Sequence, residues 1–316
     1  MDFGADWQAS LGKIKKKKGR FLRNIEYIIV LCLVKLVSVL TYKLASDIGG
    51  FLGRIAYLVD RRHRRIALQN LNKAFPDMDE EKIALIAKRS FENVGRSATE
   101  VIYIAGRRPR TLYQAIHDWV TVEGQGNLDE AVKKGKGILF LSAHFGNWEL
   151  LGIAMSASGS PLNVIARPLD NPKIDRLLTS FRSMTGSRVI PKKGALRGIL
   201  RRLKNGERIG ILIDQNTSRD EGVFVDFFGC PAATNRGPAL IAMKSGASVT
   251  PFFITREGKY RHKIIYCPEI TLHKSGDTEK DVHLNTERFT KVMESYIREY
   301  PEQWFWMHQR WKTRPE

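Results

Sequence analysis

The second half of the chain alternates short apolar runs with stretches of helical periodicity, and this alternation constrains the fold more than any other feature. The runs span residues 137–143, 163–166, 208–213 and 249–254. The first three are almost continuous in apolar residues, which is typical of central strands that helices cover on both faces. Stretches of helical periodicity at 174–185 and 196–204 separate the second run from the third. We therefore expect an α/β fold with a mixed, largely parallel central sheet flanked by helices.

Ligands of such sheets bind beyond the carboxyl ends of the strands, so the residues that follow the apolar runs are the first candidates for chemistry. The first run ends at His144, and after a turn at 145–147 the next helix carries Glu149 in its first turn. A neutral imidazole can accept the proton of an attacking hydroxyl, and a nearby carboxylate can fix its tautomer. We predict that His144 is a general base paired with Glu149; the alternative is a purely structural histidine.

Further polar residues lie near the same edge of the predicted sheet. Arg167 follows the second run and can hold a phosphate or stabilise an oxyanion, or instead form a solvent-facing salt bridge. Asp214 and Gln215 follow the third run and can orient a base, a lysine or a sugar hydroxyl, or simply form a turn. Lys192 and Lys193 add cations in a nearby loop, where a solvated charge pair is the alternative. We predict that these five residues bind substrate or stabilise an oxyanion.

Several other chemistries are disfavoured by the sequence. It contains no GxSxG nucleophile elbow, no HExxH zinc motif and no GxxxxGK[ST] phosphate loop. Metal binding by His144, Glu149 and Asp214 is disfavoured because no second histidine lies nearby, so we predict no metal site. The three cysteines are far apart and none forms a CxxC pair, which indicates a reducing compartment.

The amino-terminal part of the chain is basic first and apolar second. An apolar stretch at 25–44 is interrupted by three charged residues, and its uninterrupted part is shorter than the roughly 20 residues that span a bilayer. A tilted span, a helix in the membrane interface and a buried core helix all remain open; a signal peptide is disfavoured because no small-residue cleavage site follows. We divide the chain into a basic extension (1–24), a membrane-associated hydrophobic helical segment that acts as an anchor (25–60) and a catalytic domain (61–316).

The charge of the chain points to a polyanionic partner. Lysine and arginine number 52 against 33 acidic residues, which gives a net charge of +19. Basic clusters at 13–23, 61–65 and 310–314 flank the apolar segments and a tryptophan-rich tail, which favours an anionic membrane surface. The tail itself suits either a membrane interface or a packed terminus. Nucleic acid is a distant alternative, because no recognition helix, RNP motif or zinc finger is present.

Seven segments together resemble the bacterial lipid A biosynthesis (lauroyl/myristoyl) acyltransferases, within the lysophospholipid acyltransferase superfamily. They occur in order and cover most of the chain from about residue 25 onward. The segments are RIALQNLNKAFPDM, HFGNWELLG, ARPLDNPKID, VIPKKGALRGIL, GILIDQNT, FVDFFGCPAATNRGPALIAMKSGASVTPFF and YPEQWFWMHQRWKTRP.

The resemblance implies an acyltransferase that transfers groups other than amino-acyl groups. A fatty acyl chain would move from an acyl-carrier-protein thioester to a hydroxyl, or a hydroxyacyl chain, of a lipid A precursor at the cytoplasmic face of the inner membrane. The H-x4-D/E pair of the family falls on His144 and Glu149, its arginine on Arg167, and its Asp-Gln element on Asp214 and Gln215. The expected partners are acyl carrier protein, the glycolipid acceptor and anionic membrane lipids, with no cofactor and no nucleic acid.

In this interpretation the deprotonated acceptor attacks the thioester directly, and no covalent enzyme intermediate forms. Arg167 and backbone amides would stabilise the tetrahedral oxyanion. The alternative enzyme is an acyltransferase for another glycolipid or a lysophospholipid that uses acyl-coenzyme A as its thioester.

Overall fold

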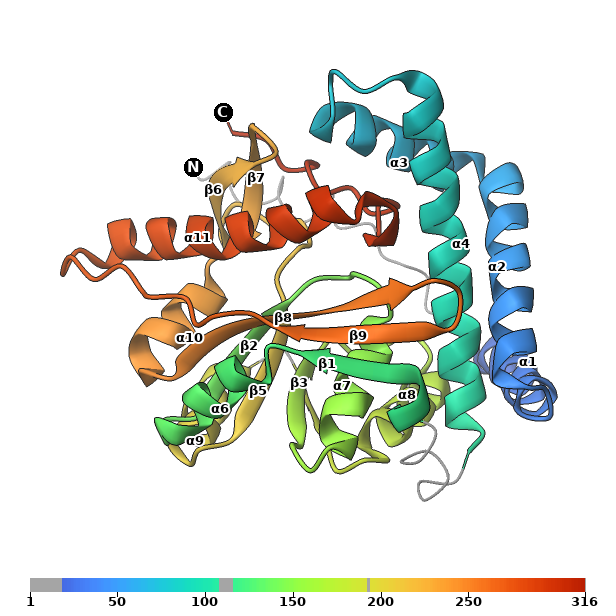
Figure 1. The fold of residues 1–316 in the computed structure, drawn as a ribbon, viewed down its shortest axis with the longest axis horizontal. Coiled ribbons are helices and arrows are strands. Elements are labelled where there is room, and N and C mark those ends of the chain that lie inside the picture. The colour runs from blue at the N-terminus through green and yellow to red at the C-terminus, as the bar shows by residue number, and fades with distance from the viewer. Residues whose placement is uncertain (1–18, 108–115, 192–193, 316) are drawn as a thin grey trace, which may run out of the picture.

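A seven-stranded sheet forms the centre of the protein in the part that the computed structural model describes, which is residues 19–107, 116–191 and 194–315 (Figure 1). The strand order is β1-β9-β8-β2-β5-β3-β4. The strands are β1 (Val120–Glu123), β2 (Ile138–Ser142), β3 (Leu162–Ala166), β4 (Arg188–Pro191), β5 (Arg208–Leu212), β8 (Ser248–Glu257) and β9 (Arg261–Tyr266). The five adjacent strands β8, β2, β5, β3 and β4 all run parallel to one another. In contrast, β9 is antiparallel to β8, and β1 is parallel to β9. The predicted mixed, largely parallel α/β sheet is confirmed.

The predicted runs coincide with strands of this sheet. The runs 137–143, 163–166, 208–213 and 249–254 contain or lie within β2, β3, β5 and β8. The two predicted helices correspond to α8 (Pro172–Ser183) and α9 (Ala195–Lys204). Every residue of β2 is buried, as a central strand covered on both faces should be.

Side chains of the central strands alternate between two apolar clusters, one on each face of the sheet. Leu139 and Leu141 of β2 join the cluster that includes α9, α10 (Gly237–Ser245) and α11 (Thr278–Glu299). Ile138 and Phe140 of the same strand join the cluster that includes α6 (Gln125–Lys133), α7 (Trp148–Ala157) and α8. This period-two alternation is what a strand with a helix layer on both sides requires.

The carboxyl-terminal tail packs into the body of the protein. It follows α11 and a short 3-10 turn, η1 (Pro301–Gln303), and lies against a hairpin of β6 (Gly222–Phe227) and β7 (Cys230–Asn235). Trp304 and Trp306 are fully buried, and Arg310 donates hydrogen bonds to the Ala233 carbonyl at 2.8 Å and to the Thr234 hydroxyl. The packed-terminus alternative therefore holds for these residues, and Arg310 does not contribute to a basic surface.

Among the described residues, the helices α1 (Arg20–Ser38), α2 (Tyr42–Val59), α3 (Arg61–Ala74) and α4 (Glu80–Ala105) precede the sheet. Figure 1 shows α4 standing beside the end of the β8–β9 hairpin, with α2 and α1 on its outer side. None of the helices in the described ranges is sufficiently long and apolar to cross a membrane. The predicted segment 25–60 falls mostly on α1 and α2; its role as an anchor stays a prediction, as do the domain boundaries. The lysine run of 13–18 lies outside the described residues.

The contact between α2 and α4 depends on glycines. A Cβ atom on Gly53 would lie 2.3 Å from the carbonyl oxygen of Phe91, and one on Gly95 would lie 2.2 Å from the carbonyl oxygen of Gly49. No real side chain tolerates such distances, so the two helix backbones approach each other closely only because these positions carry no Cβ.

We predict that Gly53→Ala lowers the stability of the protein, because α2 must move away from α4 to admit one methyl group. Gly198→Ala is the matched control, since it also lies within a helix but its Cβ would meet nothing within 4 Å. That control should be neutral or stabilising by about 0.5–1 kcal/mol, as helix propensity favours alanine. Thermal unfolding of both variants measures the difference, and equal melting temperatures would contradict the close-packing argument.

Candidate active site

His144 and Asp214 meet because their strands are neighbours in register. β2 and β5 are parallel and pair Ser142 with Leu212, so the residues two positions further on lie side by side at the carboxyl edge. His144 Nδ1 is 2.8 Å from Asp214 Oδ1, and the backbone N–H of His144 donates to Asp214 Oδ2 at 2.9 Å. The carboxylate therefore fixes both the ring and the backbone of the histidine.

The turn after His144 needs a glycine. Gly146 has a φ of +57°, and a Cβ there would lie 1.9 Å from the carbonyl oxygen of Ile254. Its N–H donates to the Gln303 carbonyl at 2.9 Å. Asn147 then caps α7 by accepting a hydrogen bond from the backbone N–H of Leu150 at 3.1 Å. These contacts fix the path of the chain from His144 into α7.

Asp214 is a fully buried carboxylate with a complete set of donors. Besides His144, the indole N–H of Trp304 donates to its Oδ2 at 2.9 Å. Burial raises the pKa of Asp214, but the neighbouring His144 and His308 outweigh burial and hold the pKa below its ordinary value. Asp214 is thus a permanent anion beside the imidazole.

The electrostatics of His144 favour a strong base. Burial lowers the pKa of His144, but the carboxylate of Asp214, with a smaller contribution from Glu149, outweighs burial, so the pKa stands above its ordinary value. Because the carboxylate accepts at Nδ1, we assign the proton of the neutral ring to Nδ1, which leaves the lone pair on Nε2. The Gln215 amide lies 3.4 Å from Nε2. The side chain of His144 is about 20% exposed.

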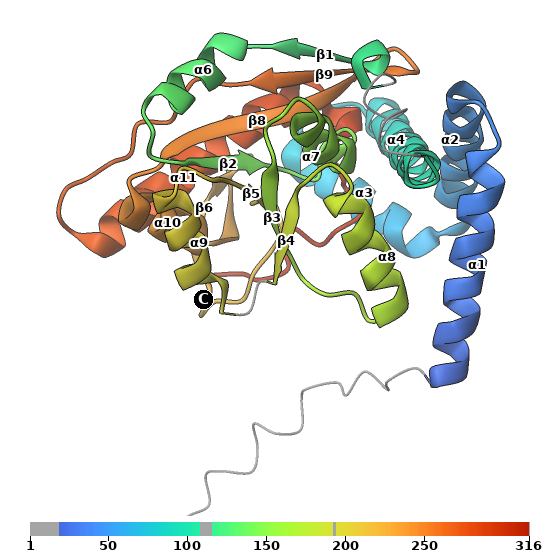
Figure 2. The same cartoon turned by 90° about the horizontal axis from the view of Figure 1, so that it is seen from below.

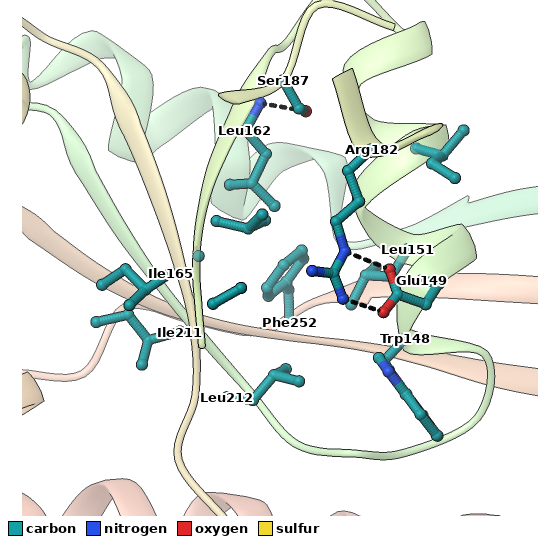
Figure 3. Close-up of a pocket in the computed structure, with 15 residues that line it drawn as sticks. Trp148, Glu149, Leu151, Leu162, Ile165, Arg182, Ser187, Ile211, Leu212 and Phe252 are labelled. Carbon is teal, nitrogen blue, oxygen red and sulfur yellow. Dashed lines mark hydrogen bonds and ion pairs between the residues drawn. The ribbon is translucent and has the colours of Figure 1, made fainter. Parts of the chain in front are cut away.

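Glu149 contacts an arginine where the sequence predicted a contact with His144. Its carboxylate receives two hydrogen bonds from Arg182 of α8, at 2.9 Å from Nε and 2.5 Å from Nη2 (Figure 3). The described contacts of His144 place Asp214, not Glu149, on Nδ1. The physical reason is that Glu149 lies in the first turn of α7 opposite α8, whereas Asp214 reaches the ring from the adjacent strand.

Arg182 is a site residue that the sequence analysis missed. The sequence pattern that could have revealed it is the spacing of Ile174, Leu178 and Arg182, which are four residues apart. This spacing places the cation on the same face of α8 as two apolar residues. A charged side chain at such a position requires a buried partner, and Glu149 supplies it. Trp304 was also missed as a site residue, because its indole was interpreted only as part of the tail.

An apolar cavity begins at the Arg182–Glu149 pair. Most of its wall is aliphatic or aromatic and comes from α7, β3, β5 and β8 (Figure 3). The lining residues include Leu151, Leu162, Ile165, Ile211, Leu212 and Phe252. Trp148 lines the cavity, and its ring centroid is 5.2 Å from that of His144. The imidazole therefore lies next to Trp148, which forms part of the wall of this apolar cavity.

The remaining predicted residues lie apart from the imidazole or outside the described ranges. Arg167 directly follows β3 and is exposed, and no described contact joins it to His144. Lys192 and Lys193 fall outside the described residues. Among the residues that are described, no three histidine, cysteine or acidic side chains form a group that could hold a metal ion.

We predict that Asp214→Asn lowers the pKa of His144, because it removes the main charge that raises it while burial remains. An NMR titration of the His144 ring measures the change. Glu149→Gln should lower the pKa less, and Asp281→Asn is the control because Asp281 pairs with a different histidine, His273, at the same 2.8 Å. A larger shift for Glu149→Gln than for Asp214→Asn would show that the assigned partner is wrong.

Comparisons with known proteins identify the family of the chain. The chain matches the family described as bacterial lipid A biosynthesis acyltransferase over residues 13–313. It is 31% identical to the lipid A biosynthesis lauroyltransferase of Escherichia coli K12, with 89% of each chain covered, and 28% identical to the palmitoleoyltransferase of the same organism, with 87% of each covered. It is also 26% identical to a phosphatidylinositol mannoside acyltransferase of Mycobacterium tuberculosis, over 70% of this chain and 69% of that one. The chain therefore belongs to the bacterial lipid A biosynthesis acyltransferase family and is an acyltransferase.

Proposed function

We propose that the protein transfers a fatty acyl chain from a thioester donor to a hydroxyl of a lipid A precursor, with His144 as general base. The observation that carries this proposal is the His144–Asp214 pair, whose imidazole contacts Trp148 in the wall of an apolar cavity. The cavity suits the acyl chain of the donor, and the exposed side of the imidazole suits the acceptor hydroxyl. The names of the relatives, lauroyltransferase and palmitoleoyltransferase, support a fatty acyl group.

The acyl group passes directly from donor to acceptor, without a covalent enzyme intermediate. Nε2 of His144 takes the proton of the acceptor hydroxyl, and Asp214 stabilises the imidazolium that forms. The acceptor oxygen attacks the thioester carbonyl, the C–S bond breaks, and the departing thiolate takes the proton from the imidazolium. The enzyme thus returns to its starting state as an ester and a free thiol are formed.

We assign the cation beside the reacting carbonyl to Arg182, in place of Arg167. Arg182 lines the cavity and is held by two hydrogen bonds to Glu149, so its guanidinium has a defined orientation. A preorganised cation next to a developing oxyanion lowers the barrier to its formation. In this proposal Glu149 positions Arg182 rather than the base, and the exposed Arg167 binds the phosphate of an acceptor.

We also propose acyl carrier protein as the donor and the cytoplasmic face of the inner membrane as the location. The family resemblance and the net charge of +19, which favours acidic partners, support both. The relative that acts on a phosphatidylinositol mannoside supports a second candidate, in which the acceptor is another glycolipid.

An acyl transfer assay tests the proposal, with acyl carrier protein and coenzyme A thioesters as donors and a lipid A precursor or a phosphatidylinositol mannoside as acceptor. We expect His144→Ala and Asp214→Asn each to lower the rate by about 10²–10⁴-fold, since a positioned base contributes about that much. His273→Ala is the matched control, because that ring makes the same Nδ1–carboxylate contact with Asp281. A folded His144→Ala variant with near wild-type turnover would contradict the assignment.

The pH profile of the same assay distinguishes a catalytic role of His144 from a purely structural one. The base must be neutral to act, so the wild-type rate should fall as pH falls through the raised pKa of His144. In Asp214→Asn the residual activity should persist to lower pH, because the pKa is lowered. If the rate of Asp214→Asn fell over the same acidic pH range as that of wild type, His144 would not be the group that titrates.

We predict that Gly152→Leu shifts the donor preference to shorter acyl chains. Gly152 lines the cavity, and a Cβ there would meet only Leu162, at 3.9 Å, so a larger side chain can enter the space. Each methylene that is excluded should cost about 0.8 kcal/mol, or about fourfold in kcat/KM. Competition between donors of different chain length measures the shift, and Gly198→Leu on α9 is the control. An unchanged preference would mean that the acyl chain binds elsewhere.

A further inference from the structure

A polar cleft lies between α4, the turn of the β8–β9 hairpin and η1. In both Figure 1 and Figure 2 the turn of this hairpin lies beside α4. The cleft has a volume of about 500 Å³ and shares no lining residue with the apolar cavity that Trp148 lines. Eight of its nine lining residues are charged or carry a side-chain amide, and the ninth is Gly258. Such a wall suits a water-soluble ligand, not an acyl chain.

The buried part of the wall is a network of fixed polar side chains. The guanidinium of Arg256 donates from Nε to the Asn93 amide oxygen at 2.7 Å and pairs with Glu100 at 2.5 Å. The side chain of Gln303 accepts from the backbone N–H of Arg256 at 2.7 Å and donates to its carbonyl at 3.2 Å. Because these contacts lie within the protein, the shape of the cleft is formed before any ligand binds.

Two cations of the wall have no carboxylate assigned to them. The buried arginines Arg96 and Arg256 are neutralised by carboxylates inside the protein. Arg89 of α4 and Lys259 of the hairpin turn are exposed, and in the described part of the chain neither side chain forms a hydrogen bond or an ion pair. Glu302 is the remaining carboxylate of the wall. Two cations against one carboxylate leave a net positive charge, so the cleft attracts an anion.

The wall combines groups that bind phosphate with groups that bind hydroxyls. Guanidinium and ammonium groups such as those of Arg89 and Lys259 bind phosphate oxygens. The carboxylate of Glu302 can accept from hydroxyls, and the Asn93 Nδ2, for which no described residue is a partner, can donate to them. An inorganic polyanion would only be repelled by Glu302. The volume of about 500 Å³ also lies within the usual range of sites for small molecules.

We propose that this cleft binds a phosphorylated sugar, with the phosphate between Arg89 and Lys259 and the hydroxyls at Glu302 and Asn93. The site is separate from the reacting site at His144. The sugar phosphate is either a soluble molecule or the headgroup of a glycolipid, since both carry the same groups. Binding of the soluble molecule does not depend on the proposed acyl transfer.

Isothermal titration calorimetry of the full-length protein with glucose 1-phosphate and glucose 6-phosphate tests the cleft. We expect Arg89→Gln/Lys259→Gln to bind at least about tenfold more weakly than wild type, because the phosphate loses both of its cations. The matched control is Lys88→Gln/Lys280→Gln, which removes two exposed lysines from α4 and α11 and leaves the same net charge. Equal binding by the two double variants would overturn the proposal. So would the absence of binding by wild type, or an equal affinity of wild type for glucose or inorganic phosphate.

Variants of the candidate active site distinguish the two possible places of binding. Arg167→Gln and His144→Ala should each bind the sugar phosphate as wild type does. If Arg167→Gln abolished binding and Arg89→Gln/Lys259→Gln did not, the ligand would bind at the active site and the proposal would be wrong.

Acyl transfer kinetics then identify the source of the sugar phosphate. If it is the headgroup of the acceptor, Arg89→Gln/Lys259→Gln should raise the KM for the acceptor about tenfold and leave kcat unchanged. If it is a soluble molecule, that variant should lose only the calorimetric binding. The calorimetry needs no acyl transfer, so failure of the cleft and failure of the proposed function are separate outcomes.

Discussion

The carboxylate of Asp214 is the interaction on which the rest of the site depends. It lies at the end of β5, accepts hydrogen bonds from the backbone and ring of His144 after β2, and accepts one more from Trp304 of the tail. A fully buried anion is stable only when such donors surround it. Three segments from distant parts of the sequence are therefore held together by one charge, and the same charge sets the basicity of the imidazole. The packed tail thus supports the site: it supplies Trp304, and α3 holds it through Asn70, whose amide donates to the carbonyls of Trp306 and His308.

A second buried carboxylate, Glu100 of α4, fixes the other side of the site. It pairs with Arg256 of β8 and accepts hydrogen bonds from Ser46 of α2 and from Asn147, the residue that caps α7. Burial raises the pKa of Glu100, but Arg256 and His262 outweigh burial and hold it below its ordinary value. Because Asn147 precedes Trp148 and Glu149, the Glu100 network positions the helix turn that carries them. The amino-terminal helices are therefore connected to the candidate active site by buried polar contacts as well as by apolar packing.

The sequence predicted the centre of the sheet better than its edge or its contacts. Continuous apolar runs revealed β2, β3 and β5, but β9 and β1 were missed because they alternate apolar and polar residues or are largely exposed. His144 and Asp214 were both found as strand-end residues, yet their pairing depends on the register of strands 70 residues apart, which periodicity does not encode. The H-x4-E spacing favoured Glu149 as the partner, and only the position of α8 shows that Arg182 occupies its carboxylate.

The contact between α1 and α8 links the amino-terminal helices to the candidate site. Asn171 caps α8, accepting from the backbone N–H of Lys173, and its amide donates to the Arg23 carbonyl and to Glu26 of α1. Toward its other end α8 carries Arg182, which pairs with Glu149 in the cavity wall. The helix is thus fixed at one end by α1 and at the other end by the Glu149 carboxylate of the candidate site. The orientation of the Arg182 guanidinium therefore depends on contacts at both ends of α8, and groups that are held in place before a reaction reduce the entropic cost of aligning the reacting atoms.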